Sequence, residues 1–125
     1  MGLTPDYPSP VVVCSTTGTG LQAGILDIES VFANFPGYPP VLQLLISATA
    51  TVVVNAAMQV TQSSSPALVD PIDVSGGGFT ASDFYDLIPG LRFYQINVTA
   101  NTGTVTVKAG FGQLLRMSNN APQGT

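Results

Sequence analysis

Carboxylates are the side chains best suited to acid–base chemistry here, because the 125-residue chain contains no histidine. Six of its seven acids form three pairs: Asp27 with Glu29, Asp70 with Asp73, and Asp83 with Asp86. Two carboxylates can hydrolyse a glycosidic bond across a sugar-sized cleft, and carboxylate oxygens also bind Ca²⁺. A chain this short leaves little material for a cleft once its core is formed. We therefore expect solvated turns and helix-start charges, with no catalytic residue and no metal site.

The single cysteine and a glycine motif provide two further candidate sites, a catalytic thiol and a dinucleotide-binding loop, and neither predicts an enzyme. Cys14 stands alone in an apolar run, and a thiol nucleophile has no histidine to serve as its base. Residues 18–23 fit the G-x-G-x-x-A pattern of dinucleotide sites, but no long amphipathic helix follows to meet the pyrophosphate. We expect Cys14 to be a buried apolar residue, residues 18–20 to form a loop, and the protein to use no cofactor. Asn97 begins an N-x-T sequon inside a predicted strand, where we interpret it as a chance match.

Aromatic side chains allow one binding function. Tyr7, Tyr38, Tyr85 and Tyr94 could line a platform on which sugar rings stack. Tryptophan is absent, and the strand pattern around Tyr94 directs that side chain toward the core. A carbohydrate-binding β-sandwich module is therefore an alternative function.

Charge excludes two classes of partner. Only three cations are present, too few to neutralise a phosphate backbone, so we expect no nucleic-acid binding.

Residues 41–60 carry no charge over the length of a bilayer span, but six polar side chains interrupt them and favour two strands. The first six residues have neither the basic start nor the apolar run of a signal peptide. We expect no membrane segment.

Most of the polar residues of the chain are uncharged. Ser, Thr, Asn and Gln total 36, against ten charged residues. Neutral hydroxyls and amides are buried against a partner at a lower desolvation cost than charges. This composition favours a protein that is part of an assembly, and a monomer with a Thr-rich β surface is the alternative.

Short β-branched segments separated by Gly and Pro predict an all-β fold. We expect a single antiparallel β-sandwich, jelly-roll or immunoglobulin-like, with an N-terminal arm (1–10), a domain (11–117) and a C-terminal tail (118–125). Pro71 predicts an edge strand. The expected strands are 11–14, 21–28, 41–46, 48–54, 58–61, 68–74, 91–100 and 104–109.

The connections are predicted from turn and cap residues. Residues 36–40 and 63–66 are expected to be loops, and Asn55-Ala56 a bend. The glycines at 76–78 mark the loosest point of the chain. Thr80 and Asp83 resemble a capping box, which predicts a short helical turn over 81–87.

The alternating pattern is clearest near the C-terminus. Residues 94, 96 and 98 share one face of a strand, and Val105 and Val107 share one face of the next. Residues 101–103, Asn-Thr-Gly, tolerate positive φ, so we expect a tight turn and a β-hairpin.

The region 46–110 resembles small β-sandwich structural proteins of tailed bacteriophages. The resemblance rests on residues 94–99 (Tyr-Gln-Ile-Asn-Val-Thr) leading into 103–107 (Gly-Thr-Val-Thr-Val). The usual Arg after Tyr is Gln95, and the usual Trp-containing strand is missing. The pattern has low specificity.

This resemblance implies a non-enzymatic virion protein, made in the host cytoplasm. A capsid cement or decoration protein is expected, bridging major capsid proteins as a homodimer or homotrimer. A tail, baseplate or fibre component is the alternative within this class.

Overall fold

Ten strands and one short helix form the described part of the chain, residues 10–32, 40–87 and 91–111 of a computed structural model. The elements in chain order are β1 (Val11–Thr16), β2 (Gly20–Asp27), α1 (Ile28–Phe32), β3 (Pro40–Ile46), β4 (Ala50–Ala57), β5 (Gln59–Val60), β6 (Leu68–Val69), β7 (Ile72–Asp73), β8 (Asp83–Asp86), β9 (Phe93–Asn101) and β10 (Val105–Phe111).

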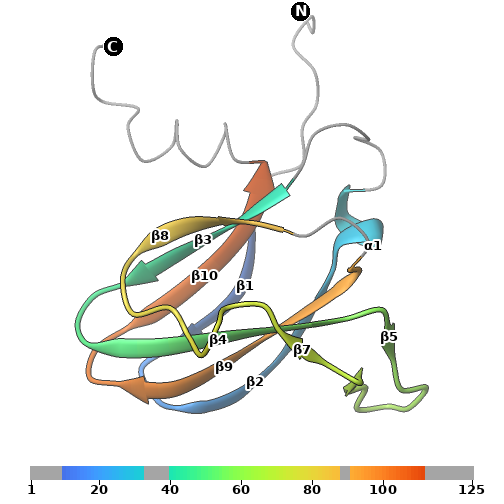
Figure 1. Cartoon of the computed structure of the whole chain (residues 1–125), viewed down its shortest axis with the longest axis horizontal. Coiled ribbons are helices and arrows are strands. Elements are labelled where there is room, and N and C mark those ends of the chain that lie inside the picture. Colours follow the sequence, from blue (N-terminus) through green and yellow to red (C-terminus); the bar gives the residue numbers. More distant parts are fainter. Residues whose placement is uncertain (1–9, 33–39, 88–90, 112–125) are drawn as a thin grey trace, which may run out of the picture.

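Eight of these strands form two four-stranded antiparallel sheets that pack face to face (Figure 1). Sheet A has the order β1-β10-β3-β8 and sheet B the order β2-β9-β4-β7. Each strand of sheet A therefore has its chain neighbour at the same position in sheet B. This is the strand order of an eight-stranded jelly roll, one of the two sandwich types that we expected. The remaining strands, β5 and β6, pair with each other.

Alternation along the strands builds the core between the two sheets. Tyr94, Ile96 and Val98 of β9 are completely buried, and Val105 and Val107 of β10 meet them from sheet A. The intervening residues of these strands face away from the core. The predicted inward faces of both strands are confirmed.

Seven of the expected strands appear with shifted ends. The extended segment 68–74, which Pro71 interrupts, forms two short strands, β6 and β7, in different sheets. The segment 41–60 forms β3, β4 and β5, as the polar interruptions indicated. The strands span Val11 to Phe111, inside the predicted domain 11–117. The arm (apart from Pro10), the tail and most of the proline-rich loop lie outside the described residues.

The predicted hairpin, which joins strands 91–100 and 104–109, is wrong. β9 pairs with β2 and β4, whereas β10 pairs with β1 and β3, so the chain crosses from one sheet to the other at 102–104. Two alternating strands joined by a short turn have the same sequence pattern whether they pair with each other in one sheet or lie in different sheets. None of residues 101–103 has the positive φ that we expected.

The predicted helical turn over 81–87 is also wrong. Residues 83–86 form β8, which pairs with β3 from Val41 to Leu44. Pairing with the open edge of β3 satisfies more backbone groups than one isolated helical turn can. Tyr85 then points inward, and its ring packs on Phe79 with centroids 5.2 Å apart.

Two smaller expectations had different outcomes. β4 continues through Asn55 and Ala56 without the predicted bend, because both residues pair with β7 on one side and β9 on the other. Pro71 does lie at an edge, since it precedes β7, the last strand of sheet B.

Candidate functional site

Four connections between the two sheets meet at one end of the sandwich, which we call the crossover end. They are residues 17–19, 47–49, 74–82 and 102–104. Because both sheets have the same strand order, these connections lie side by side, with 102–104 between 17–19 and 47–49. Their order along this end is 17–19, 102–104, 47–49 and 74–82. Figure 1 shows several of these turns at the end of the sandwich away from α1.

Asn101 joins the first two connections. Its side-chain Nδ2 donates hydrogen bonds to the carbonyl oxygens of Thr16 at 3.3 Å and Gly18 at 3.1 Å. Its Oδ1 accepts a hydrogen bond from the backbone N–H of Gly103 at 2.9 Å. One side chain therefore fixes the turn that follows it and the neighbouring turn.

Hydroxyl groups join the next pair of connections. The Thr102 hydroxyl accepts a hydrogen bond from the Thr49 N–H and donates one to the Thr49 carbonyl, both at 3.1 Å. The Ser47 hydroxyl accepts a 2.7 Å bond from the N–H of Thr104. These bonds between connections restrict the conformations that the turns can adopt.

The last connection is fixed in a similar way. The Ser82 hydroxyl accepts a bond from the Ile46 N–H at 2.7 Å. At the start of this connection the Asp73 carboxylate accepts bonds from the N–H groups of Ser75 and Gly77. The Ser75 hydroxyl also donates to this carboxylate and, as the largest cause, holds the pKa of Asp73 below its usual value. The glycines that we expected to be the loosest point thus form a bonded turn.

The four connections share one chemical property: they contain no Asp, Glu, Lys or Arg. Thr and Ser supply their polar side chains. The tripeptide Thr-Gly-Thr occurs in two of them, at 17–19 and 102–104. This repeat is the sequence signal for the crossover end, but the prediction of a hairpin turn at residues 101–103 concealed it. The crossover end is a fixed surface of hydroxyls and glycines. Its four connections contain no charged residue, and the carboxylates of Asp73 and Asp83 border the 74–82 connection.

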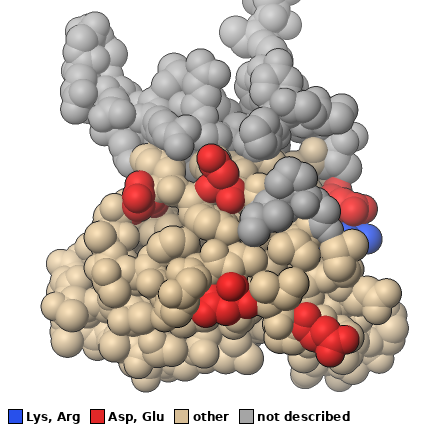
Figure 2. Space-filling model, in the orientation of Figure 1, with Lys and Arg blue, Asp and Glu red and all other residues tan. Residues whose placement is uncertain are grey.

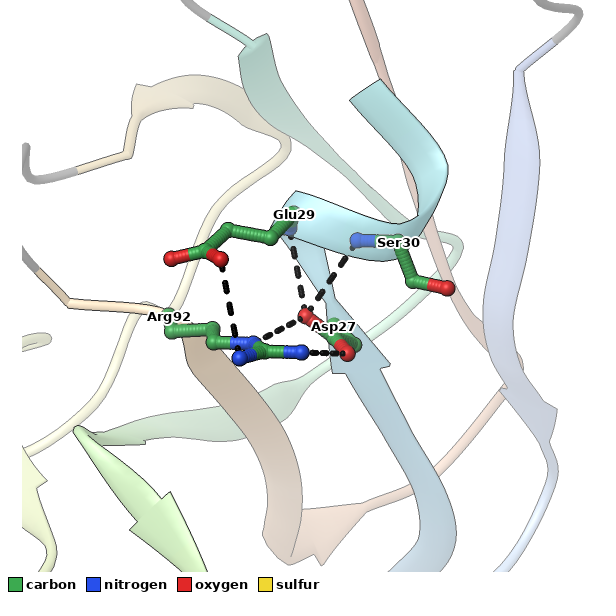
Figure 3. A network of polar contacts seen from close by, with 4 residues as sticks. All are labelled: Asp27, Glu29, Ser30 and Arg92. Atoms are coloured by element: carbon green, nitrogen blue, oxygen red, sulfur yellow. Dashed lines mark hydrogen bonds and ion pairs between the residues drawn. The ribbon is translucent and has the colours of Figure 1, made fainter. Parts of the chain in front are cut away.

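The first acid pair has a structural role (Figure 3). Asp27 accepts hydrogen bonds from Nε and Nη2 of Arg92 at 2.8 and 2.9 Å. It also accepts bonds from the N–H groups of Glu29 and Ser30 at the start of α1. The Arg92 hydrogen bond is the largest cause of the lowered pKa of Asp27. Arg92 also lies 3.5 Å from Glu29.

The remaining acids are spread over separate elements. Asp70 is exposed with a φ of 49°, Asp73 caps a turn, and Asp83 and Asp86 bound β8. Within residues 10–32, 40–87 and 91–111, no three His, Cys, Asp or Glu side chains gather as metal ligands.

The other candidates take part in the fold. Cys14 is buried, and burial raises the pKa of its thiol, as expected of an apolar residue. Residues 18 and 19 lie in the 17–19 connection, and Gly20 begins β2, so a strand and not a helix follows. Tyr94 is buried, and the Tyr85 hydroxyl donates to the Val74 carbonyl at 3.1 Å. Asn97 is half-buried in β9, between β2 and β4. Tyr7 and Tyr38 lie outside the described residues.

Two buried glutamines were not predicted. Gln95 of β9 donates from Nε2 to the Gln22 carbonyl at 2.8 Å, where the pairing of β2 shifts register. Gln43 of β3 is 3% exposed, and its Nε2 has no hydrogen-bond partner among the described residues. The strand pattern alone does not indicate that an outward-facing position will be buried.

No known protein family, curated protein or solved structure matches this chain. Among the helices in the described part, none has the length and apolar character needed to cross a membrane.

Proposed function

We propose that this protein is a non-enzymatic structural component of a tailed-phage particle, and specifically a capsid cement or decoration protein. The observation that carries this proposal is the crossover end: four bonded connections without a single charged residue. The phage assignment rests on the sequence resemblance, and the docking role rests on the character of this surface.

The physical argument concerns the cost of docking. A charged side chain loses strong hydration when it is buried, whereas a hydroxyl exchanges one hydrogen bond for another. Hydrogen bonds between the connections already restrict the turns that carry Thr49 and Thr102. Compared with a charged or flexible surface, such a surface therefore loses less of its interaction energy to desolvation and ordering when it binds.

Stabilisation of a shell then follows by mass action. A protein that binds neighbouring major capsid proteins only in the assembled shell shifts the equilibrium toward that shell. The jelly roll suits this role by analogy, because viral capsid domains and lectins share it, although a fold does not define a function.

A particle experiment tests the proposal. Particles of the phage that encodes this chain are prepared with and without its gene, and their heat resistance and capsid content are compared. We expect the protein to co-purify with shells, and particles without it to burst at a lower temperature. The cement role would be overturned if the protein is not found in particles made with its gene, or if both preparations resist heat equally.

A matched pair of variants tests the surface. Thr19→Glu places a charge on the exposed crossover end. Ser64→Glu places the same charge on the 61–67 loop between β5 and β6, away from the crossover end. Added back to particles that lack the protein, the first should bind at least tenfold more weakly than wild type, and the second should bind normally. Equal binding of both would contradict docking through the crossover end.

The same particles distinguish the alternatives. Protein found only in detached tails would favour the tail, baseplate or fibre role. Retention on a polysaccharide column, without binding to particles, would favour the carbohydrate-binding module.

A further inference from the structure

Two outward-facing residues of β3, in the middle of sheet A, are almost completely buried. Leu42 and Leu44 of this strand belong to the core between the sheets. Val41 and Gln43 alternate with them and therefore point outward, yet they are only 2% and 3% exposed. Val53, which faces outward from the equivalent strand β4 of sheet B, is only half-buried. We call the surface formed by Val41 and Gln43 the outer β3 face.

The neighbouring strands do not account for this burial. On β10 the partner of Val41 is Gly110, which has no side chain. On β8 its partner is Asp86, which is exposed. Val12, on the outer side of the edge strand β1, is 56% exposed. The outer β3 face therefore requires a further segment of chain above it, and that segment does not extend over β1.

The amide of Gln43 indicates the chemistry of this cover. Its Nε2 is buried and has no hydrogen-bond partner among the described residues. Water or polar side chains above this face would offer it an acceptor, whereas apolar side chains exclude water and offer none. The outer β3 face therefore favours an apolar cover.

Residues 112–117 follow β10 in sequence and start beside this face. Phe111, the last residue of β10, pairs with Pro40, the first residue of β3. Six residues span up to about 20 Å when extended, and Gln43 lies about 10 Å along β3 from Pro40. A segment that reverses direction after β10 is therefore long enough to cross the outer β3 face. Its sequence, Gly-Gln-Leu-Leu-Arg-Met, contains three large apolar side chains.

The other segments outside the described ranges fit this face less well. Residues 33–39 lead from α1 to β3, and residues 88–90 lead from β8 to β9. Both segments are tied at each end to the end of the sandwich away from the crossover end, which limits their reach along β3. Residues 1–9 lead into β1, where the exposed Val12 shows that the sheet is open.

Charge also favours residues 112–117 over the N-terminal arm. Asp86, the partner of Val41, forms no ion pair with another described residue. Figure 2 shows acids as separate red patches on one face of the molecule, with blue only at one rim. Arg116 is the single cation outside the described ranges, whereas the one charge of the arm is the acid Asp6. A cation is attracted to this side of sheet A, and a further acid is repelled.

We propose that residues 112–117 dock on the outer β3 face of the same molecule, with Leu114 and Leu115 over Val41 and Gln43. This contact removes apolar surface of both parts from water. The inference is independent of the virion role, because it rests only on the burial, pairing and charge of this face. It makes 112–117 part of the domain and leaves 118–125 as the tail.

Thiol labelling of the full chain tests the cover. Val41→Cys is the reporter, Val12→Cys is an exposed reference, and the buried Cys14 remains protected as long as the sandwich is folded. We expect slow labelling at position 41, and a rate at least tenfold higher after Leu114→Ser and Leu115→Ser, with Cys14 still protected. Labelling at position 41 as fast as at position 12, or a rate that the two serines leave unchanged, would overturn the proposal.

A matched pair of substitutions in the N-terminal arm is the control. Leu3→Ser and Tyr7→Ser also replace two large side chains by serine outside the described ranges. We expect them to leave labelling of Val41→Cys unchanged. If they expose position 41 and the substitutions at Leu114 and Leu115 do not, the arm is the cover and the proposal is wrong.

A double-mutant cycle gives an independent readout of the contact. Val41→Ala and the pair Leu114→Ala/Leu115→Ala are measured separately and together by urea unfolding. We expect the combined effect on the unfolding equilibrium constant to be at least threefold smaller than the product of the separate effects, because both changes remove the same contact. Val12→Ala with the same leucine pair should give the simple product. A simple product at Val41, or coupling only at Val12, would overturn the proposal.

Discussion

Arg92 and Asp27 form a two-pronged ion pair, with Nε 2.8 Å from Oδ1 and Nη2 2.9 Å from Oδ2. The pair joins the residue before β9 to the last residue of β2, where the N–H of Ile28 also donates to the Arg92 carbonyl at 3.0 Å. Asp27 additionally accepts two N–H bonds from α1. The Asp27 carboxylate therefore holds together the end of β2, the start of α1 and the start of β9.

Stability should depend on pH through Asp27. Its folded-state pKa is lowered, chiefly by the Arg92 hydrogen bond, so its contribution is fully present above the unfolded pKa. That contribution is lost as the pH falls below about 4, through the folded-state pKa. We expect the difference in unfolding free energy between wild type and Asp27→Asn to be constant near neutrality and to shrink in acid. Urea titrations between pH 7 and pH 2 measure it.

Arg92→Gln provides the control for this pH dependence. In that background the main cause of the lowered pKa of Asp27 is absent, so the effect of Asp27→Asn should vary much less with pH. An unchanged pH dependence would show that Arg92 is not the cause.

Asn101→Ala should destabilise the crossover end. The substitution removes two donated bonds and one accepted bond, and leaves the carbonyls of Thr16 and Gly18 without these partners. We expect a loss of about 3 kcal/mol in the free energy of unfolding, since each of the three bonds contributes about 1 kcal/mol. Asn97→Ala is the control: Asn97 lies half-buried in the same strand, and none of the side-chain bonds in the described part involves it. Equal losses would argue against the bridging role of Asn101.

Gly78→Ala should cost more stability than Gly76→Ala. Gly78 has a φ of 127°, and an added Cβ would lie 2.5 Å from Cγ2 of Thr51. Gly76 has a φ of 65°, and an added Cβ there meets open space. We expect a loss of about 1 kcal/mol for Gly76→Ala, the usual cost of the left-handed conformation, and at least twice that for Gly78→Ala. Thermal melting of both variants checks the order, and the reverse order would contradict a packed glycine turn.

The two buried glutamines should respond to methionine with opposite signs. Gln43→Met removes a buried Nε2 for which the described part of the chain provides no partner, so we expect stabilisation by about 1 kcal/mol. Gln95→Met deletes the bond to the Gln22 carbonyl, so we expect destabilisation by about 1–2 kcal/mol. Denaturant unfolding of both variants measures the signs. Destabilisation by Gln43→Met would show that its amide is satisfied in solution.

Most of the β-sandwich could be predicted from local pattern. Alternation identified the buried faces of β9 and β10, and Pro71 marked an edge, because period-2 burial and a missing N–H act within a single strand. The crossover end could not be predicted as a surface. Asn101 reaches Gly18 across 83 residues of sequence, and only the shared strand order of the two sheets brings these turns together.

Apolar character, alternation and the low number of charges can be derived from the amino-acid order alone, because they are properties of side chains and of their nearest neighbours along the chain. The assignment of β9 and β10 to different sheets, and the strand at residues 83–86, become evident in the folded molecule. The reason is that a strand pairs with whichever edge is left open. That choice depends on contacts distant in sequence, and a short turn or a local capping signal is compatible with more than one outcome.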